Sequence, residues 1–321
     1  MSAVPVPRVP QSLEARVSAV REELWFGDDD PRRTEEAAAA SLAAATAECV
    51  GLKPFPAVAA KAMQLVQDPN VSVPMLGECI ESDAVIATRL LRVANSALYR
   101  PARPYVSIEQ AIMRLGLNTV VELVVGIATM QMFDDESGVG EQVRRHSAGM
   151  AAVSRVLATE QRYPGVGTVF LASLLADMGQ LLIAQSGELN YAALPESAQD
   201  TDQTHLYERA QLGYDHAVLG AHVLHEWEFP SLLCQAVALS HQPVRAFESA
   251  GELPRIVTFM RVADAVMHVI REAPEVDALE EACQTIAKSM AGQRLSLSPA
   301  VLVAMWPRFE ETAHEMVSLL S

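Results

Sequence analysis

Five residues in the second half of the chain have side chains that can hold a metal ion or move a proton: His146, Asp177, His216, His241 and Asp264. Neutral imidazole and carboxylate groups are the usual protein ligands of Zn, Fe, Mn and Ni, and ligands from several helices can meet in the core of a helical bundle. The presence of each residue can also be explained by a purely structural role, without a metal. Asp215 can cap a helix that starts at His216, and an imidazole near a helix end, as at His241, interacts favourably with the helix dipole. Spacing alone therefore does not establish a shared metal site.

The elements that must position these side chains are helices. Apolar residues recur with a helical period in one segment after another, and no alternating strand pattern or Asn-Gly hairpin signal interrupts the series. Helix ends are marked by the capping box of Ser107 and Gln110 and by a stop at Gly116. The stretch FLASLLADMGQLLIAQ, residues 170–185, is expected to form one apolar helix with Asp177 on its flank. The sequence predicts an all-α fold.

Two groups of predicted helices are separated by the acidic, glycine-containing stretch FDDESGVGE, residues 133–141. We expect an N-terminal helical bundle over residues 34–135 and a C-terminal helical bundle over residues 139–321. Residues 1–33 are expected to form a tail with a short helix, because LEARVSAVREELWF places its apolar residues on one helical face.

Charge and composition exclude some classes of function. The formal net charge of −16 opposes sequence-independent binding of nucleic acid, although a local pair of arginines can still bind a small anion. The four cysteines lie far apart without a Cys-x-x-Cys pair, as expected of reduced thiols in a cytosolic protein. The longest apolar stretch, residues 117–133, is interrupted by Asn118 and Glu122. We therefore expect a cytoplasmic protein with no membrane segment and no nucleic-acid partner.

The order and surroundings of the five residues carry a family resemblance. The series His146, LLADMG, HAVLG, SHQP and VADAV resembles the HD superfamily of metal-dependent phosphohydrolases, in which the pattern is His, His-Asp, His, His, Asp across a helical bundle. Upstream, LKPFPAVAAKAMQLVQDP, IESDAVIATRLLRVANSALY and SIEQAIMRLGLNTV resemble the N-terminal part of HDOD (HD-related output domain) proteins of bacterial signalling. The resemblance covers residues 50–270 and implies that the C-terminal bundle is HD-like.

Three positions depart from the HD pattern. Ala176 stands where the pattern has a metal-ligating histidine, Ser240 stands where many relatives have the first of two histidines, and Gln180 replaces a lysine. The Gly-Tyr-Pro element of the HD-GYP variants that cleave cyclic dinucleotides is also missing from SHQPVRAFESAG. A catalytic metal needs at least three protein ligands and an open position for water, so the loss of an imidazole weakens any such site.

The resemblance thus implies a degenerate site without catalytic residues, bound metal or cofactor. Its remnants are His146, Ala176, Asp177, His216, His241 and Asp264. By family geometry, His216 or His241 is the nearest hydrogen-bond donor for Asp177, and we expect such an Asp–His network to replace the metal.

Arginines are concentrated in RLLRVANSALYRPARPY of this acidic chain. They can form helix-surface salt bridges to Glu81 or Asp83, or a local basic patch for an acidic partner or an anionic nucleotide. Asn95 and Tyr99 are expected to hydrogen-bond the following loop and to hold the two bundles together. The candidate interaction patch comprises Arg89, Arg92, Asn95, Tyr99, Arg100 and Arg103.

The resemblance implies a non-catalytic bacterial signal-transduction module that acts through a protein partner. Two alternatives stay open: a metal-dependent phosphohydrolase or phosphodiesterase, and a sensor that binds a nucleotide such as a cyclic dinucleotide without turnover. The sequence leaves undecided the partner, the pathway, the oligomeric state and whether a residual metal is retained.

Overall fold

The protein was analysed as a computed structural model that describes residues 36–52, 54–99, 101–132, 138–194, 201–272 and 276–320. Within these ranges it is all-α, as predicted, and contains no strand. The tail predicted over residues 1–33 lies outside the described residues.

The first subdomain is a bundle around one central helix. It contains α3 (Ala57–Gln67), α4 (Val73–Glu81), α5 (Ala84–Ala94), α6 (Ile108–Leu115) and α7 (Leu117–Met132). Helix α7 is buried along most of its length and contacts the other four. Half of the predicted capping box forms: Ser107 Oγ accepts from the Gln110 amide, whereas Gln110 Oε1 accepts from the amide of Val106, one residue before the N-cap. Gly116, with φ of 86°, ends α6 as predicted.

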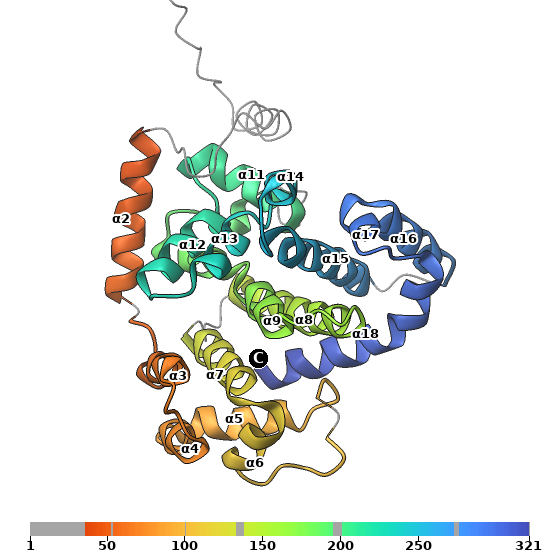
Figure 1. Ribbon diagram of the computed structural model, residues 1–321. Coiled ribbons are helices and arrows are strands. Elements are labelled where there is room, and N and C mark those ends of the chain that lie inside the picture. Colours follow the sequence, from red (N-terminus) through yellow and green to blue (C-terminus); the bar gives the residue numbers. More distant parts are fainter. Residues whose placement is uncertain are drawn as a thin grey trace, which may run out of the picture.

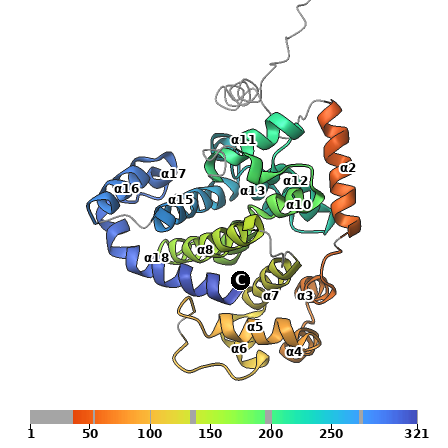
Figure 2. The same cartoon turned by 180° about the vertical axis from the view of Figure 1, so that it is seen from behind.

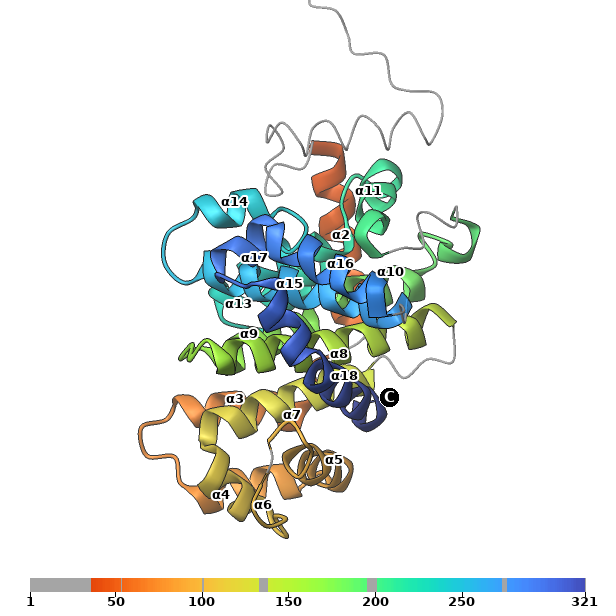
Figure 3. The ribbon, with the colours of Figure 1, turned by 90° about the vertical axis from the view of Figure 1, so that its right-hand side faces the viewer.

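The second subdomain is built around α8 (Gly138–Glu160), which packs against helices on several sides. Its other elements are α9 (Val166–Leu175), α10 (Met178–Ser186), η1 (Tyr191–Ala193), α11 (Thr201–Leu212), α12 (His216–Glu226), α13 (Ser231–Ala238), α14 (Pro243–Glu248), α15 (Leu253–Glu272), α16 (Val276–Lys288), α17 (Met290–Arg294) and α18 (Pro299–Leu320). Figure 3 shows the first subdomain as a layer beneath α8, α9 and α18.

Helix α2 (Glu36–Leu52) does not pack with the bundle to which the sequence assigns it. The sequence places it with residues 34–135, whereas in the structure it runs beside α12 of the second subdomain (Figures 1 and 2). Its small buried face, Leu42, Ala45 and Cys49, joins an apolar cluster that contains residues of α12 and also of the first subdomain. A short apolar face can pack on either bundle, so sequence proximity did not determine its neighbour.

The predicted single helix over residues 170–185 is broken. It forms α9 and α10, and Asp177 occupies the N-cap position of α10 without a side-chain cap bond. Next to the break, α10 crosses the start of α12 closely. A Cβ atom on Gly179 would lie 2.0 Å from the carbonyl oxygen of His216, so only glycine allows the two backbones to approach in this way.

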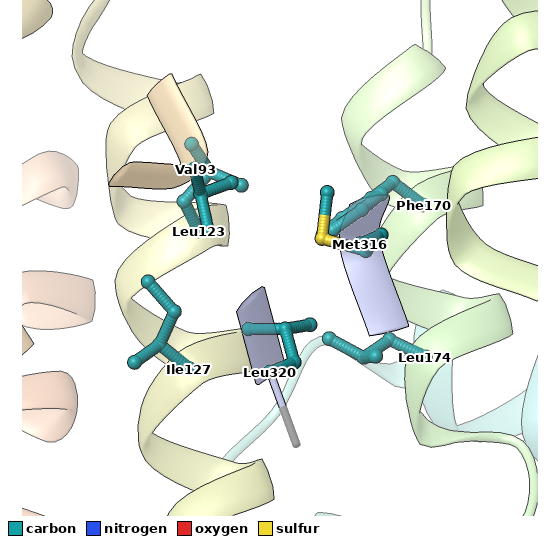
Figure 4. A pocket seen from close by; sticks show the side chains of 7 residues that line it. All are labelled: Val93, Leu123, Ile127, Phe170, Leu174, Met316 and Leu320. Atoms are coloured by element: carbon teal, nitrogen blue, oxygen red, sulfur yellow. The ribbon is translucent and has the colours of Figure 1, made fainter. Parts of the chain in front are cut away.

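The joint between the subdomains is apolar. Figure 4 shows Val93, Leu123 and Ile127 of the first subdomain facing Phe170 and Leu174 of α9, with Met316 and Leu320 of α18 beside them. The gap between these side chains has no room for a water molecule. Helix α18 thus packs against both bundles at a joint that excludes water.

One segment, Val166–Ser186, is long and apolar enough to cross a membrane by length and composition, but 83% of its apolar window is buried inside the fold. It also consists of two helices, α9 and α10. Both observations are typical of helices in the core of a folded domain.

Candidate functional site

The structure brings the five residues together inside the second subdomain. His146 lies in α8, Asp177 at the junction of α9 and α10, His216 at the start of α12, His241 after α13, and Asp264 in α15. Of the five, only His241 is partly exposed; the other four residues have exposed fractions of 7% or less. Five segments that are remote in sequence therefore contribute to one buried polar cluster.

One group of donors surrounds Asp264. Its Oδ1 is 3.1 Å from Nε2 of His146 and 3.3 Å from Nδ1 of His268, which lies one turn further along α15. Its Oδ2 accepts a hydrogen bond from Nη1 of Arg261 at 2.8 Å. Burial raises the pKa of a carboxyl group, but Arg261 and the two imidazoles outweigh this effect and hold the pKa of Asp264 well below its usual range. Asp264 is therefore a buried carboxylate anion.

A second group contains Asp177, His216 and His241. Nε2 of His216 faces Nε2 of His241 at 2.8 Å, a hydrogen bond when one of the two carries a proton. On the other side of the ring, Nδ1 of His216 is 2.6 Å from Oε2 of Glu208, which also accepts from the His216 amide. Glu208 is fully buried, and its Oε1 accepts from the hydroxyl of Tyr191 at 2.7 Å. Glu208 thereby fixes the orientation of the His216 ring.

The two imidazoles of this group differ in protonation. Burial opposes protonation of His216, but the charges and contacts of Glu208 and Asp177 outweigh it and hold the pKa of His216 well above its usual range. Burial and neighbouring cationic groups hold the pKa of His241 well below its usual range. At neutral pH, His216 is therefore charged and donates to both Glu208 and neutral His241.

The hydrogen bond predicted from Asp177 to a neighbouring histidine does not form. Oδ1 of Asp177 is 3.7 Å from Nε2 of His216, beyond hydrogen-bond distance. Its Oδ2 is buried, has no hydrogen-bond partner among the described residues, and lies 3.9 Å from Nε2 of His146. The histidines pair instead with Glu208 and Asp264. Asp177 therefore pairs with the charged ring of His216 at ion-pair distance through Oδ1, while its Oδ2 accepts no hydrogen bond among the described residues.

The structure shows what occupies the three positions that depart from the HD pattern. Ala176 is 1% exposed and belongs to an apolar cluster with residues of α8 and α15. The hydroxyl of Ser240 donates to the carbonyl oxygen of Val237 at 2.8 Å. Nε2 of Gln180 is 3.4 Å from Nδ1 of His216. None of these three side chains supplies the missing imidazole.

Metal-binding chemistry is nevertheless present. Two sets of donors each bring their ligand atoms within 4.8 Å of one another: Asp177 with His216 and His241, and His146 with Asp264 and His268. Imidazole and carboxylate donors suit Zn, Mn, Fe and Ni. The unpartnered oxygen of Asp177 also fits a nearby cation. The absence of a bound metal stays a prediction.

Sequence analysis missed four members of the cluster. Arg261 and His268 share one face of α15 with Asp264, three residues before it and four after it, so helical spacing could have found them. Glu208 comes from α11, as does His205, whose ring stacks on that of His241 with centroids 4.4 Å apart. No local pattern marks these two residues, because only tertiary packing brings α11 to the site.

The residues of the predicted interaction patch have two different environments. Arg92 and Arg103 are exposed and Arg89 is partly exposed, whereas Arg100 lies outside the described residues. Within the described part, no ion pair joins Arg89 or Arg92 to an acidic neighbour. The carboxylate of Asp83 caps α5 instead, by accepting from the Val85 and Ile86 amides.

Asn95 and Tyr99 have structural roles, in the following loop and between the two subdomains. The amide group of Asn95 donates to the carbonyl oxygen of Tyr105 and accepts from its backbone N–H, at 3.0 and 2.7 Å, so it clamps the loop as expected. Tyr99 joins the subdomains through its ring, which lies 4.3 Å from the guanidinium carbon of Arg155 in α8. Its hydroxyl has no hydrogen-bond partner among the described residues. Neither side chain is free to contact a partner.

The chain is similar in sequence to a known protein. An uncharacterized protein of Treponema pallidum (strain Nichols) is 21% identical over 222 residues, which is 68% of this chain and 43% of the relative. This chain therefore spans less than half the length of that relative.

Solved structures share the fold. A proposed phosphohydrolase from Shewanella amazonensis SB2B has a TM-score of 0.68 at 23% identity and covers 87% of this chain and 98% of its own. An HDOD domain protein with unknown function from Geobacter sulfurreducens has a TM-score of 0.65 at 18% identity and covers 96% and 99% of the two chains. At these identities the likeness is one of fold alone. The model of the HDOD domain matches residues 52–243, more than half of the chain. The chain belongs to the HDOD domain family.

Proposed function

We propose that this HDOD-family protein is a non-catalytic, cytoplasmic signal-transduction module of a bacterium that acts by binding a protein partner. The observation that carries the proposal is Ala176, which is packed among apolar side chains at the position of a metal-ligating histidine. A methyl group cannot ligate a metal, and the surrounding donors are almost completely buried. A phosphoester substrate and its attacking water therefore have little access to them.

The surface that we propose for the partner is the arginine face of the first subdomain. Residues 84–121 contain five arginines and one acidic residue, Glu109, in a chain of net charge −16. Arg92, Arg103 and Arg114 are exposed, and within the described part they have no ion-pair partner. Unpaired guanidinium groups bind carboxylates well, so an acidic protein surface fits this face.

Turnover is the direct test of the non-catalytic role. We expect hydrolysis of cyclic dinucleotides and model phosphoesters to stay at background, even with added Mn²⁺. Asp177→Ala is the matched control, because it removes a central carboxylate of the cluster. Clear turnover by the unmodified protein that disappears in Asp177→Ala would make the protein a phosphohydrolase.

The docking face is tested separately by charge reversal. The double variant Arg89→Glu with Arg92→Glu should lose partners that crosslink to the native protein in its own cells, since the charge that attracts them is reversed. Lys61→Glu with Lys288→Glu changes the net charge equally at other exposed positions and should retain them. Equal loss in both variants would indicate a general charge effect and no specific face.

A further inference from the structure

Glu122 is an acidic residue at the apolar joint between the two subdomains. It is partly buried and interrupts a run of buried apolar residues in α7. Gly126, one turn further along α7, lies against the side chains of Phe170 and Leu174 in α9. Residues four apart on a helix share one face, so Glu122 belongs to the face of α7 that meets the second subdomain.

The carboxylate of Glu122 lies directly over the backbone of Gly167, in the first turn of α9. A Cβ atom at position 167 would overlap both oxygens of this carboxylate, so the missing side chain makes room for it. The start of a helix attracts negative charge, but no amide of α9 donates to Glu122. Among the described residues its carboxylate forms no hydrogen bond and no ion pair.

Arg155 of α8 is the cation whose charge acts on Glu122. Its guanidinium carbon lies 4.3 Å from the ring centroid of Tyr99 and 6.0 Å from that of Phe170. Arg155 therefore rests on aromatic rings and stabilises the charge of Glu122 only from a distance.

Few other titratable groups face Glu122. Tyr99, from the segment after α5, is close enough for the charge of Glu122 to raise its pKa to about 12, together with burial. Helix α9 has no titratable side chain, and no charged residue of α3–α6 or α18 in the described part of the chain shifts the pKa of Glu122. The ionised carboxylate is thus poorly compensated in the closed joint.

The protonation state of Glu122 follows from this environment. Burial raises its pKa to about 7, because the opposing effect of Arg155 is smaller. A solvated glutamate has a pKa of about 4.3. The stabilisation from the raised pKa is therefore complete below about pH 4.3 and is lost as the pH rises through about 7. At pH 6 the closed joint holds mainly the neutral acid, and at pH 8 mainly the anion.

We propose that Glu122 makes the docking of the two subdomains depend on pH near neutrality. Uptake of one proton by its carboxylate tightens the joint, and release of that proton loosens it. The proton comes from solvent and returns to it when the joint opens. The inference concerns the joint alone and does not depend on the proposed partner function.

The test measures opening of the joint in the full chain. Val93 is 1% exposed and lines the joint in Figure 4. In Val93→Cys, the new thiol reacts with iodoacetamide only when the joint opens. Mass spectrometry follows labelling at this position, and each rate is divided by that of a small-molecule thiol at the same pH. The corrected rate should rise about tenfold from pH 6 to pH 8, because only the closed joint binds the proton in this range.

Two variants in the Val93→Cys background identify the group responsible. Glu122→Gln should abolish the rise, because an amide has no proton to release. Glu78→Gln, at an exposed position of α4, should keep it. A rate that does not change with pH when Glu122 is present overturns the proposal. An equal rise after Glu122→Gln overturns it too.

A second measurement decides the matter if Val93→Cys does not fold or its thiol does not react. Urea unfolding of the unmodified protein and of Glu122→Gln is compared at pH 6 and pH 8. Glu122→Gln should gain stability relative to the unmodified protein between these two values. Other titrating groups, such as His205, contribute to both proteins and cancel in the difference. The same difference at both pH values would refute a pH-dependent joint.

Discussion

At the scale of single residues, the buried carboxylate of Glu208 accepts three hydrogen bonds. They come from the hydroxyl of Tyr191 and from the amide and Nδ1 of His216, at 2.7, 2.8 and 2.6 Å. The last of these is charge-assisted, because His216 is held in its protonated form. Glu208 therefore joins η1 and α11 to the start of α12.

We expect Glu208→Gln to lower the free energy of unfolding by about 1–3 kcal/mol, since the amide cannot serve both donors of His216 as a carboxylate does. Urea denaturation followed by circular dichroism at neutral pH measures the change. Glu226→Gln, at an exposed position of α12, should stay within about 0.5 kcal/mol of the unmodified protein. Equal stability of the two variants would show that Glu208 contributes no net stabilisation.

His205 should make the protein sensitive to mild acid. Burial lowers the pKa of His205 to about 4. Its pKa in the unfolded chain is about 6.5, so below that pH the unfolded state binds a proton that the folded state does not. Stability should fall as the pH decreases from about 6.5 to about 4, by up to about 3 kcal/mol from this residue. The raised pKa of His216 does not change the stability in this pH range, because the stabilisation that it provides is already fully present below pH 6.5.

The replacement His205→Phe tests this expectation. It keeps a ring stacked on His241 and removes the titration, and Nδ1 of His205 has no hydrogen-bond partner among the described residues. Thermal melts between pH 7.5 and 4.5 should show a shallower decline for the variant. A decline as steep as that of the unmodified protein would assign the acid sensitivity to other groups.

At the scale of elements, the break between α9 and α10 creates the site. It lets α10 cross the start of α12 at Gly179, and it places Asp177 beside His216 at a helix end. Gly179, the second residue of α10, has no side chain that would hold the two backbones apart at this crossing.

Gly179→Ala should therefore cost about 1–3 kcal/mol or more, because its Cβ would overlap the carbonyl oxygen of His216 and force a backbone shift. Gly51→Ala is the control, since nothing lies within 4 Å of the added atom in helix α2. The control should be neutral or stabilising by up to about 1 kcal/mol. Chemical denaturation of both variants provides the comparison, and a tolerated Gly179→Ala would mean that the crossing can relax.

At the scale of the whole molecule, the two subdomains share one apolar cluster. It includes buried residues of α3–α7, of α9, α10 and α12, and of α18. A second cluster joins α8, α15 and α16–α18. Because the first cluster crosses the joint, we expect the subdomains to unfold together in one transition.

Met316→Ala should lower the free energy of unfolding by about 2–5 kcal/mol, because it removes a fully buried side chain from the joint and enlarges the gap there. Met290→Ala removes the same atoms from a side chain that is 54% exposed and should have little effect. Unfolding is followed both by tryptophan fluorescence and by circular dichroism. Coincident transitions support a shared core, whereas two separate transitions would show that the subdomains are independent.

The sequence by itself determined the features that depend on neighbouring residues. Helical periodicity, the N-cap at Ser107 and the stop at Gly116 act over one or two turns, and the structure has them where they were predicted. The resemblance also identified His146, His216 and Asp264, which the structure brings together. These residues could be found because their order along the chain is itself a pattern.

Only the tertiary structure decided what surrounds those residues. Glu208 and His205 reach the site from α11, and α2 packs on α12 although it precedes the first bundle in the chain. Next to the break at Asp177, α10 crosses α12, a helix about forty residues further on in the chain, and the local apolar pattern contains no information about this crossing. The donors around Asp264 depend on how α8 packs against α15, since His146 and His268 belong to different helices and meet only when that packing forms.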